Sequence, residues 1–347
     1  MKSRKFNLFV GIDVSKQTLD VAISHNGNGV QHSQVTNDAS GIHALVTWLL
    51  RVEPDPSQIL VCLEHTGNII EKLCHVLLSR ELFTWVVNPY VIKRNNPVLE
   101  RGKTDKSCSV KIMHFAESHC KHAQCYEPRT GHIQQVKALF LLRKQLVGLR
   151  RQILNQNAAN NDKLVPDPIC SGTYKRIKEQ LTAEIKVIER QIIVLMREDS
   201  SLTKIYQILL SVPGIGPVTA QHLLFVTDGF KRFNNYKQMA CYIGTAPFPH
   251  QSGSSVYKRP RTSKKAYGAL KADLHQGVLS VTRKGRFFGD YYNFMKNEKG
   301  KHHNWIINAI INMILKVVFK LVEKKVEFED NFFLQNKQSW QKLLQLS

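Results

Sequence analysis

The sequence predicts an α/β domain at the N-terminus, a long antiparallel helical arm, and a mainly helical C-terminal domain. Short apolar runs bounded by turn residues fill the first part of the chain, with helical patterns between the later runs. Apolar residues then recur every three or four positions between residues 132 and 195, which is typical of amphipathic helices. At 347 residues the chain is long enough for two or three separate cores. We expect domains over residues 1–125, 126–200 and 201–330, with a tail at 331–347.

The N-terminal elements follow an order that is informative about their fold. A strand that reaches Asp13, a turn, and a β-prone run over 18–24 predict a hairpin, and a third strand is expected over 30–35. A helix over 40–51, a strand over 58–63, a helix over 68–79 and a strand over 82–87 should follow. This order is compatible with an RNase H-like sheet, in which the first strand lies beside the fourth.

Acidic residues stand at unusual places in these elements. Asp13 lies within an apolar strand, where an unpaired carboxylate is costly, so it needs a partner. A metal ion is one such partner, and the backbone amides of the following turn are the other. In the expected sheet, Asp13 and Glu64 converge on one edge. Asp105 begins a further helix, and it either faces the same edge or serves only at the helix N-terminus.

The charge balance points to a polyanionic partner. Lys and Arg total 49 against 27 acids, a net charge of +22, and cations that neutralise phosphates gain affinity by releasing counterions. No apolar stretch approaches the roughly 20 residues that span a bilayer, so no membrane partner is expected. The absence of a secretory signal and of any CxxC pair among seven cysteines favours a cytoplasmic protein with reduced thiols.

The middle of the chain carries the seam of a long helix. The expected seam residues are Ile133, Val136, Leu139, Leu142, Leu146, Leu149 and Ile153. A second seam runs from Ile177 to Leu195 after two prolines, so the pair predicts an antiparallel hairpin of helices or a dimerising arm. The outer face of the first helix is basic, and either solvent or nucleic acid suits such a face.

The C-terminal part contains two stretches suited to phosphate. Gly214 and Gly216 lie in a tight turn that opens a helix, as in helix-hairpin-helix modules whose amides approach a phosphate, although a plain helix–helix turn is the alternative. Ser252 lies beside glycine in an expected loop. The basic block that follows it comprises Lys258, Arg259, Arg261, Lys264 and Lys265. Such cations can hold a phosphate and stabilise the charge of phosphoryl transfer.

Taken together, these motifs resemble the DEDD-type insertion-sequence transposases, relatives of the pilin-gene invertases. The acid motifs matched are Gly11-Ile12-Asp13-Val14-Ser15-Lys16, Glu64-His65-Thr66-Gly67 and Lys103-Thr104-Asp105-Lys106. The C-terminal matches are Val212-Pro213-Gly214-Ile215-Gly216-Pro217, Tyr242-Ile243-Gly244, Ala246-Pro247, Gln251-Ser252-Gly253 and Ser263-Lys264-Lys265. They occur in the family's order over nearly the whole length, with a helical arm between the two halves.

The resemblance implies a RuvC-like, RNase H-fold domain in which Asp13, Glu64 and Asp105 bind Mg²⁺ or Mn²⁺. It also implies a C-terminal domain in which Ser252 is the nucleophile of DNA strand cleavage and rejoining, during site-specific recombination of an insertion element. The partners implied are the element ends and target DNA, in some members a guide RNA encoded by the element, and further copies of the chain in a homodimer or homotetramer. The expected location is the bacterial nucleoid.

Two positions depart from the family pattern. Cys108 stands where the fourth acid should be, and a thiol is a soft ligand that suits magnesium poorly. Either three carboxylates suffice, or Asp20 replaces the fourth if it faces the same side as Asp13, or the chain is a nucleic-acid-binding derivative without strand cleavage. Ala266-Tyr267 follows the basic pair where the family usually has Gly-Asn.

Actin-like sugar kinases form another class that opens with Gly-Ile-Asp at the end of a first strand. They need a second phosphate-binding turn rich in Asp and Gly later in the chain, and this sequence contains none. A net charge of +22 is also unhelpful for a sugar kinase. The sequence therefore argues against this class.

Overall fold

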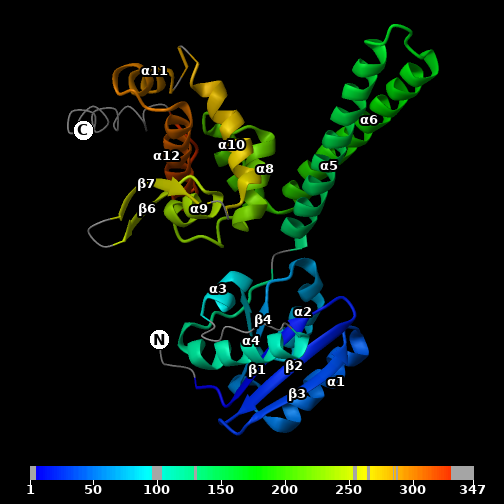
Figure 1. Ribbon diagram of the computed structural model, residues 1–347, viewed down its shortest axis with the longest axis vertical. Helices are drawn as coiled ribbons and strands as arrows, with labels where there is room; N and C mark the ends of the chain where they lie inside the picture. Colours follow the sequence, from blue (N-terminus) through cyan, green and yellow to red (C-terminus); the bar gives the residue numbers. More distant parts are fainter. Residues whose placement is uncertain are drawn as a thin grey trace. The chain divides into compact units, whose positions relative to one another are not determined.

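The computed structural model describes residues 5–95, 104–128, 131–252, 256–263, 266–283, 285–286 and 288–329, without the side chains of residues 249–252 and 256–260 (Figure 1). The chain divides into two compact units, Met1–Pro128 and Arg129–Ser347. The expected tail at 331–347 lies outside the described residues.

A five-stranded mixed sheet forms the centre of the N-terminal unit. Its strands are β1 (Leu8–Val14), β2 (Thr18–His25), β3 (Val30–Thr36), β4 (Ile59–Glu64) and β5 (Phe83–Val87). Their order is β3-β2-β1-β4-β5, with β1 antiparallel to β2 and parallel to β4. The first strand thus lies beside the fourth, which confirms the expected order and is consistent with an RNase H-like fold.

Helices cover both faces of this sheet (Figure 1). They are α1 (Ala39–Val52), α2 (Glu71–Ser79), α3 (Pro89–Arg94) and α4 (Asp105–His119), with short 3₁₀ turns η1 (Pro56–Gln58), η2 (Gly67–Ile70) and η3 (Cys120–His122). Side chains alternate between the faces of a strand. Val10 and Ile12 of β1 therefore join the core shared with α1 and α2, whereas Cys62 of β4 packs with Ile112 of α4 on the opposite face.

Helix α4 lies in direct backbone contact with β1 at Gly11. A Cβ atom on Gly11 would lie 2.2 Å from the Met113 nitrogen and 2.3 Å from the Ser109 carbonyl oxygen, so only glycine fits. Thr104 is the N-cap of α4, in a reciprocal capping box with Ser107. The strand contact and the cap together define where the first turn of α4 lies.

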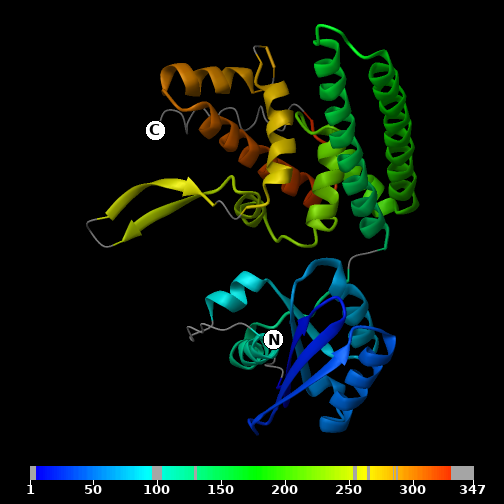
Figure 2. The same ribbon diagram turned by 45° about the vertical axis from the view of Figure 1, so that its right-hand side comes forward.

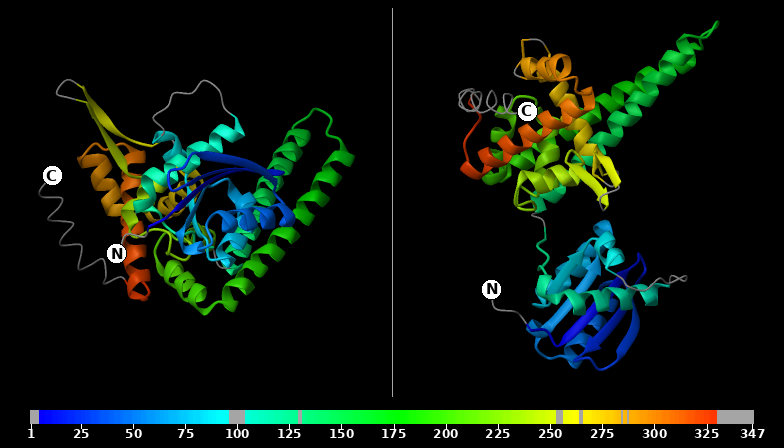
Figure 3. Two further views of the ribbon diagram at one scale, coloured as in Figure 1. Left: turned by 90° about the horizontal axis from the view of Figure 1, so that it is seen from below. Right: turned by 60° about the vertical axis from the view of Figure 1, so that its left-hand side comes forward.

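The helical arm consists of α5 (Gly131–Asn161) and α6 (Pro168–Glu198), which run side by side (Figure 3). Arg143 Nε donates a hydrogen bond of 2.7 Å to Glu189 Oε1 between them. At the base of the arm, Ile133 and Phe140 share a core with the C-terminal helices. The expected seam is wrong at Leu142 and Leu149, which are exposed, because the buried positions step from Val136 to Phe140 instead.

The rest of the C-terminal unit is helical apart from one β-hairpin (Figure 2). Its helices are α7 (Ser200–Ser211), α8 (Pro217–Thr227), α9 (Tyr236–Ile243), α10 (Gly268–Val281), α11 (Gly289–Asn293) and α12 (His303–Lys324), with a π-helical turn η4 (Phe294–Glu298). The hairpin pairs β6 (Pro247–Ser252) with β7 (Val256–Thr262). The expectation of a loop around Ser252 is therefore corrected, because Ser252 is the last residue of β6.

Helix α12 corrects the expectation about apolar stretches. By length and composition it is long enough and apolar enough to cross a membrane. Half of its most apolar stretch is nevertheless buried within the unit, and the side chains of Ile306, Ile307 and Ile310 are fully covered. The structure therefore uses α12 as the core helix of the C-terminal unit.

We expect Gly11→Ala to lower the free energy of unfolding by about 1–3 kcal/mol, because the added methyl group forces α4 away from β1. The matched control is Gly148→Ala in α5, where nothing lies within 4 Å of the new Cβ. That control should be neutral or stabilise by up to about 1 kcal/mol. Urea denaturation of the full chain measures both, and equal stabilities of the two variants would contradict the contact between α4 and β1.

Candidate functional site

Asp13 and Glu64 lie at the carboxyl ends of two neighbouring parallel strands. Ile12 is level with Leu63 in the register of β1 and β4, so the two acids occupy the next positions. By strand alternation both lie on the face that α4 covers, together with Gly11 and Cys62. Neighbouring strands are about 4.8 Å apart, so the sheet holds these two carboxylates side by side.

Asp105 and Cys108 belong to the first turn of α4, just before Ser109 touches Gly11. Asp105 is exposed and Cys108 is half-buried. Across the described part of the chain, no group of three or more His, Cys, Asp or Glu residues is arranged to hold a metal ion. The sheet thus brings two of the three predicted acids together, and Asp105 does not complete a preformed metal site with them.

Asp20 is expected to replace the fourth acid only if it faces the same side as Asp13. It does, because it is directly opposite Asp13 across the hairpin of β1 and β2. The residue is only 4% exposed. Gln34 Nε2 donates a hydrogen bond of 3.0 Å to its Oδ2, and His32 Nε2 lies 3.3 Å from its Oδ1. Its carboxylate is therefore already held by neighbours on β3.

The donor types on this face can be compared with the needs of a divalent cation. Carboxylate oxygens are the ligands that Mg²⁺ and Mn²⁺ prefer, so Asp13 and Glu64 fit such an ion. The Cys108 thiol does not. Glu117, three turns further along α4, lies 3.7 Å from Nδ1 of His114 on its own helix.

The hairpin of β6 and β7 carries Ser252 and most of the basic block. Ser252 is level with Val256, Lys258 with His250, and Arg261 with Phe248. Arg259 lies on the same strand, and the Arg261 side chain is exposed. Lys264 and Lys265 lie outside the described residues.

Several interactions fix the root of this hairpin to the helices below it. Lys271 Nζ donates a hydrogen bond of 2.9 Å to the Gly244 carbonyl, and burial lowers the pKa of Lys271. The Thr245 hydroxyl lies 2.5 Å from Asn312 Oδ1 on α12. The Tyr267 amide donates to the Tyr242 carbonyl at 2.8 Å. The orientation of the hairpin thus depends on both α10 and α12.

A buried histidine that the sequence analysis missed supports Tyr267. His222 is 1% exposed, its Nδ1 lies 2.5 Å from Asp273 Oδ2, and its Nε2 lies 3.1 Å from the Tyr267 hydroxyl. Burial, with Tyr242 and Asp273 nearby, raises the pKa of Tyr267, so its hydroxyl stays protonated beside His222 Nε2. The sequence could not indicate this role, because a single histidine within an apolar helix belongs to no recognisable motif. Its partner Asp273 is 51 residues away along the chain.

The two glycines of the predicted phosphate turn have different surroundings. Gly214 has a φ of +88°, and its carbonyl oxygen would lie 1.9 Å from a Cβ atom on Gly277 of α10. The structure therefore explains why position 214 is glycine: the residue lies in a left-handed turn that packs against a helix. Gly216 is exposed, forms the N-cap of α8, and has nothing within 4 Å of a Cβ position.

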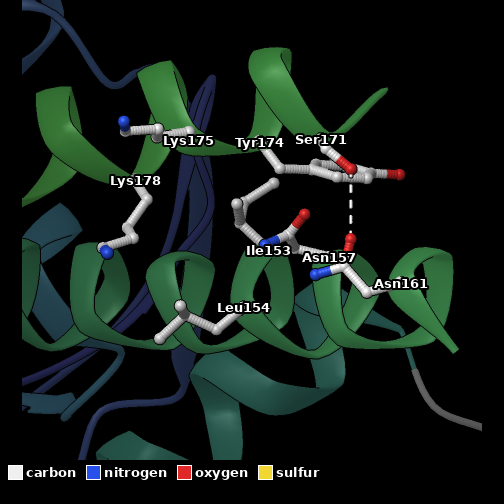
Figure 4. Close-up of a pocket in the computed structure, with 8 residues that line it drawn as sticks. All are labelled: Ile153, Leu154, Asn157, Asn161, Ser171, Tyr174, Lys175 and Lys178. Carbon is white, nitrogen blue, oxygen red and sulfur yellow. Dashed lines mark hydrogen bonds between the residues drawn. The ribbon is translucent and has the colours of Figure 1, made fainter. Parts of the chain in front are cut away.

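A pocket of about 320 Å³ lies between α5 and α6 (Figure 4). Its lining residues are Ile153, Leu154, Asn157, Asn161, Ser171, Tyr174, Lys175 and Lys178. The Ser171 hydroxyl donates a hydrogen bond of 3.1 Å to Asn161 Oδ1 at one end of the pocket. None of the site residues predicted from the sequence lines it.

Comparison with known proteins decides the family. Residues 10–164 match a family model for DEDD transposases of the IS110 type, and residues 206–293 match the model of the transposase IS116/IS110/IS902 family. The chain belongs to the IS110/IS116/IS902 transposase family. The resemblance inferred from the motifs is confirmed.

Relatives of this transposase cover most of its length. The pilin gene-inverting proteins of Moraxella lacunata and Moraxella bovis are each 28% identical over 308 residues, which is 87% of this chain and 91% of theirs. A probable family 20 transposase of Pseudomonas aeruginosa is 27% identical over 310 residues, which is 79% of this chain and 84% of that protein. A transposase of this family is an enzyme of DNA phosphoryl transfer, and its DEDD domain implies the use of a divalent metal.

We expect Cys108→Asp to raise the affinity of this transposase for Mn²⁺ by about tenfold or more, because a carboxylate replaces a soft thiol on the helix that covers the face of Asp13 and Glu64. A titration followed by electron paramagnetic resonance measures free Mn²⁺. Cys125→Asp, which adds the same charge at an exposed position outside the acid face, is the matched control. Equal affinities of the two variants for Mn²⁺ would show that position 108 is not part of the metal site. Adding Asp13→Asn to Cys108→Asp should cancel the increase in affinity.

Proposed function

We propose that this transposase cleaves and rejoins DNA at the ends of an insertion element, with Ser252 as the nucleophile. The observation that carries the proposal is the pairing of Asp13 with Glu64 on one face, in a chain whose two units each match a transposase model. Acids at adjacent strand ends are suited to binding a divalent cation against a nucleic-acid backbone.

In the N-terminal unit, Asp13, Glu64 and Asp105 would hold Mg²⁺ or Mn²⁺. Such an ion, when bound, polarises phosphate oxygens and so makes phosphorus easier to attack. The strand register supports the roles of Asp13 and Glu64. Asp105 would join them from the first turn of α4, whose position is defined by the contact with Gly11 and the Thr104 cap.

In the C-terminal unit, Ser252 Oγ would form a bond to phosphorus while one phosphodiester P–O bond breaks. The proton that serine loses ends on the displaced oxygen, which leaves as a free DNA hydroxyl. Attack by the hydroxyl of another strand on this phosphoserine reverses the step and releases Ser252. Cations on the same hairpin, among them Lys258, Arg259 and Arg261, would offset the charge of this exchange, and Lys264 and Lys265 of the same basic block would extend this role.

The partners follow from charge and shape. A net charge of +22 supports contact with element and target DNA, and with a guide RNA along the basic face of the arm. The amide of Gly216 at the start of α8 would approach a phosphate, with Gly214 shaping the turn. Leu142 and Leu149 leave apolar surface exposed on α5, which supports assembly into a homodimer or homotetramer. This activity belongs in the bacterial nucleoid.

A second candidate function is a nucleic-acid-binding derivative that keeps the fold and loses strand cleavage. The observation that favours it is Cys108 at the position of the fourth acid. The sheet, the arm and the basic hairpin would be unaffected by this replacement, so binding would persist without chemistry.

We expect Ser252→Ala to abolish the covalent protein–DNA adduct that forms with Mg²⁺, because no hydroxyl remains to attack phosphorus. Denaturing electrophoresis of labelled element ends detects the adduct. Ser255→Ala, three residues further along the chain, is the matched control and should keep the adduct. An unchanged adduct yield in Ser252→Ala would exclude this serine, whereas no adduct from the natural chain but abundant adduct from Cys108→Asp would favour the second candidate.

Replacing Lys258, Arg259 and Arg261 together by glutamine should flatten the dependence of DNA affinity on salt. The slope of log K against log[salt] should fall by up to about 2.7, since each lost phosphate contact removes about 0.9. Fluorescence anisotropy at several salt concentrations measures it. A control with Lys72, Arg80 and Lys121 replaced, three exposed cations of the N-terminal unit, should keep the slope. The same slope in both variants would place the contacts elsewhere.

A further inference from the structure

The segment between α11 and α12 combines lysines with aromatic rings in a repeated manner. We call residues 292–305 the aromatic–lysine segment. Its three lysine ammonium groups each lie over a ring: Lys296 Nζ is 5.8 Å from the Tyr292 centroid, Lys299 Nζ is 5.7 Å from that of Phe294, and Lys301 Nζ is 5.5 Å from that of Trp305. At these distances a cation is attracted to the face of a ring.

The backbone of the aromatic–lysine segment is held in place. The Lys299 amide donates to the Phe294 carbonyl at 3.2 Å, and the Lys301 amide donates to the Met295 carbonyl at 2.9 Å. The Tyr292 hydroxyl lies 2.8 Å from His303 Nδ1, which ties the start of the segment to the start of α12. The turn η4 is π-helical, a rare geometry that is frequent at functional sites. The lysines and rings are thus presented in a defined arrangement.

Trp305 lies at the surface although it belongs to a core helix. Its residue is 48% exposed, whereas Ile306 and Ile307, which follow it directly, are fully buried. Single exposed apolar residues are common, so exposure alone decides nothing. Here, however, the exposed indole is accompanied by three exposed lysines, and the acid within the segment is Glu298.

Most of this surface lies beyond the two family models, with Tyr292 and Asn293 inside the second match. The two family models end at residues 164 and 293, before the η4 turn begins. Its action needs neither Ser252 nor the acids of the N-terminal unit, so it goes beyond the proposed strand cleavage.

We propose that the aromatic–lysine segment binds single-stranded nucleic acid, with an unpaired base stacked on Trp305 and phosphates beside Lys296, Lys299 and Lys301. Exposed aromatic rings with flanking cations are the usual elements of single-strand binding, since every base offers a π-face. In a duplex both faces of an internal base are covered by its neighbours, so the indole can stack only on an unpaired or terminal base. An acidic membrane would also attract the lysines, but the apolar residues that follow Trp305 are already covered by the protein core.

The test uses the full chain with Ser252→Ala, which prevents cleavage during the measurement. The probes are fluorescein-labelled oligothymidylate, oligouridylate of equal length, a blunt duplex, and vesicles of phosphatidylserine and phosphatidylcholine. Trp305→Ala should weaken binding to the single strands by about tenfold, and Trp305→Phe should restore most of it, because a phenyl ring still stacks. Tyr90→Ala, which removes an equally exposed ring in the N-terminal unit, is the matched control and should bind like the parent.

Two further measurements guard against misfolding of the variants. Quenching of tryptophan emission by oligothymidylate should be smaller in Trp305→Phe than in the parent, although both bind. Replacing Lys296, Lys299 and Lys301 by glutamine should lower the salt slope by about 2, at roughly 0.7 for each contact on a single strand. Equal affinities of Trp305→Ala and Tyr90→Ala, a preference for the duplex, or Trp305-dependent binding to vesicles alone would each overturn the proposal. If the natural chain forms no covalent adduct while these binding tests succeed, the proposed chemistry fails and this site stands.

Discussion

The N-terminal unit depends on the contact between the backbone of α4 and the backbone of β1 at Gly11. Because no side chain separates the two, the helix lies closer to the sheet than ordinary packing allows. This closeness keeps the first turn of α4, with Asp105 and Cys108, on the face where Asp13 and Glu64 end their strands. Any chemistry on this face therefore depends on a residue that has no functional group.

In the C-terminal unit, hydrogen bonds rather than a close backbone contact fix the position of the functional element, the hairpin of β6 and β7. The root of this hairpin is held by polar groups from helices distant in sequence, among them Lys271 and Asn312. The buried contact of His222 with Asp273 and Tyr267 adds a second support next to the basic block. These partially buried hydrogen bonds specify one orientation, because a polar group left without its partner there is costly.

Much of the fold could be predicted because local patterns and pairing rules agree. Alternating apolar residues and turn residues predicted every strand of the five-stranded sheet, and the order of elements predicted that β1 lies beside β4. The pairing of Asp13 with Glu64 follows from that order alone. The position of Asp105 relative to them could not be derived, because it depends on how a helix packs across a sheet. The seam of α5 was misplaced at Leu142 because residues 138–142 are all apolar, so the helical period fits Phe140 as well as Leu142.

Other parts carried no usable pattern. His222 meets Asp273 and Tyr267 only through tertiary packing, so nothing in its neighbourhood along the chain indicates a role. The strands of the small hairpin contain prolines and cations, which are untypical of strands, and this composition suggested a loop. The exposed indole of Trp305 was equally invisible, since in the sequence it reads as one more apolar residue of α12.

The direct opposition of Asp13 and Asp20 has a thermodynamic consequence. Two carboxyl groups that face each other across one antiparallel pair repel each other when both are ionised, which opposes the pairing of β1 with β2. A cation bound by Asp13 and Glu64 would offset negative charge on this face, so its binding free energy would also add to the stability of the folded sheet. Metal binding and the stability of the β1–β2 hairpin would then be thermodynamically linked, so that each would favour the other.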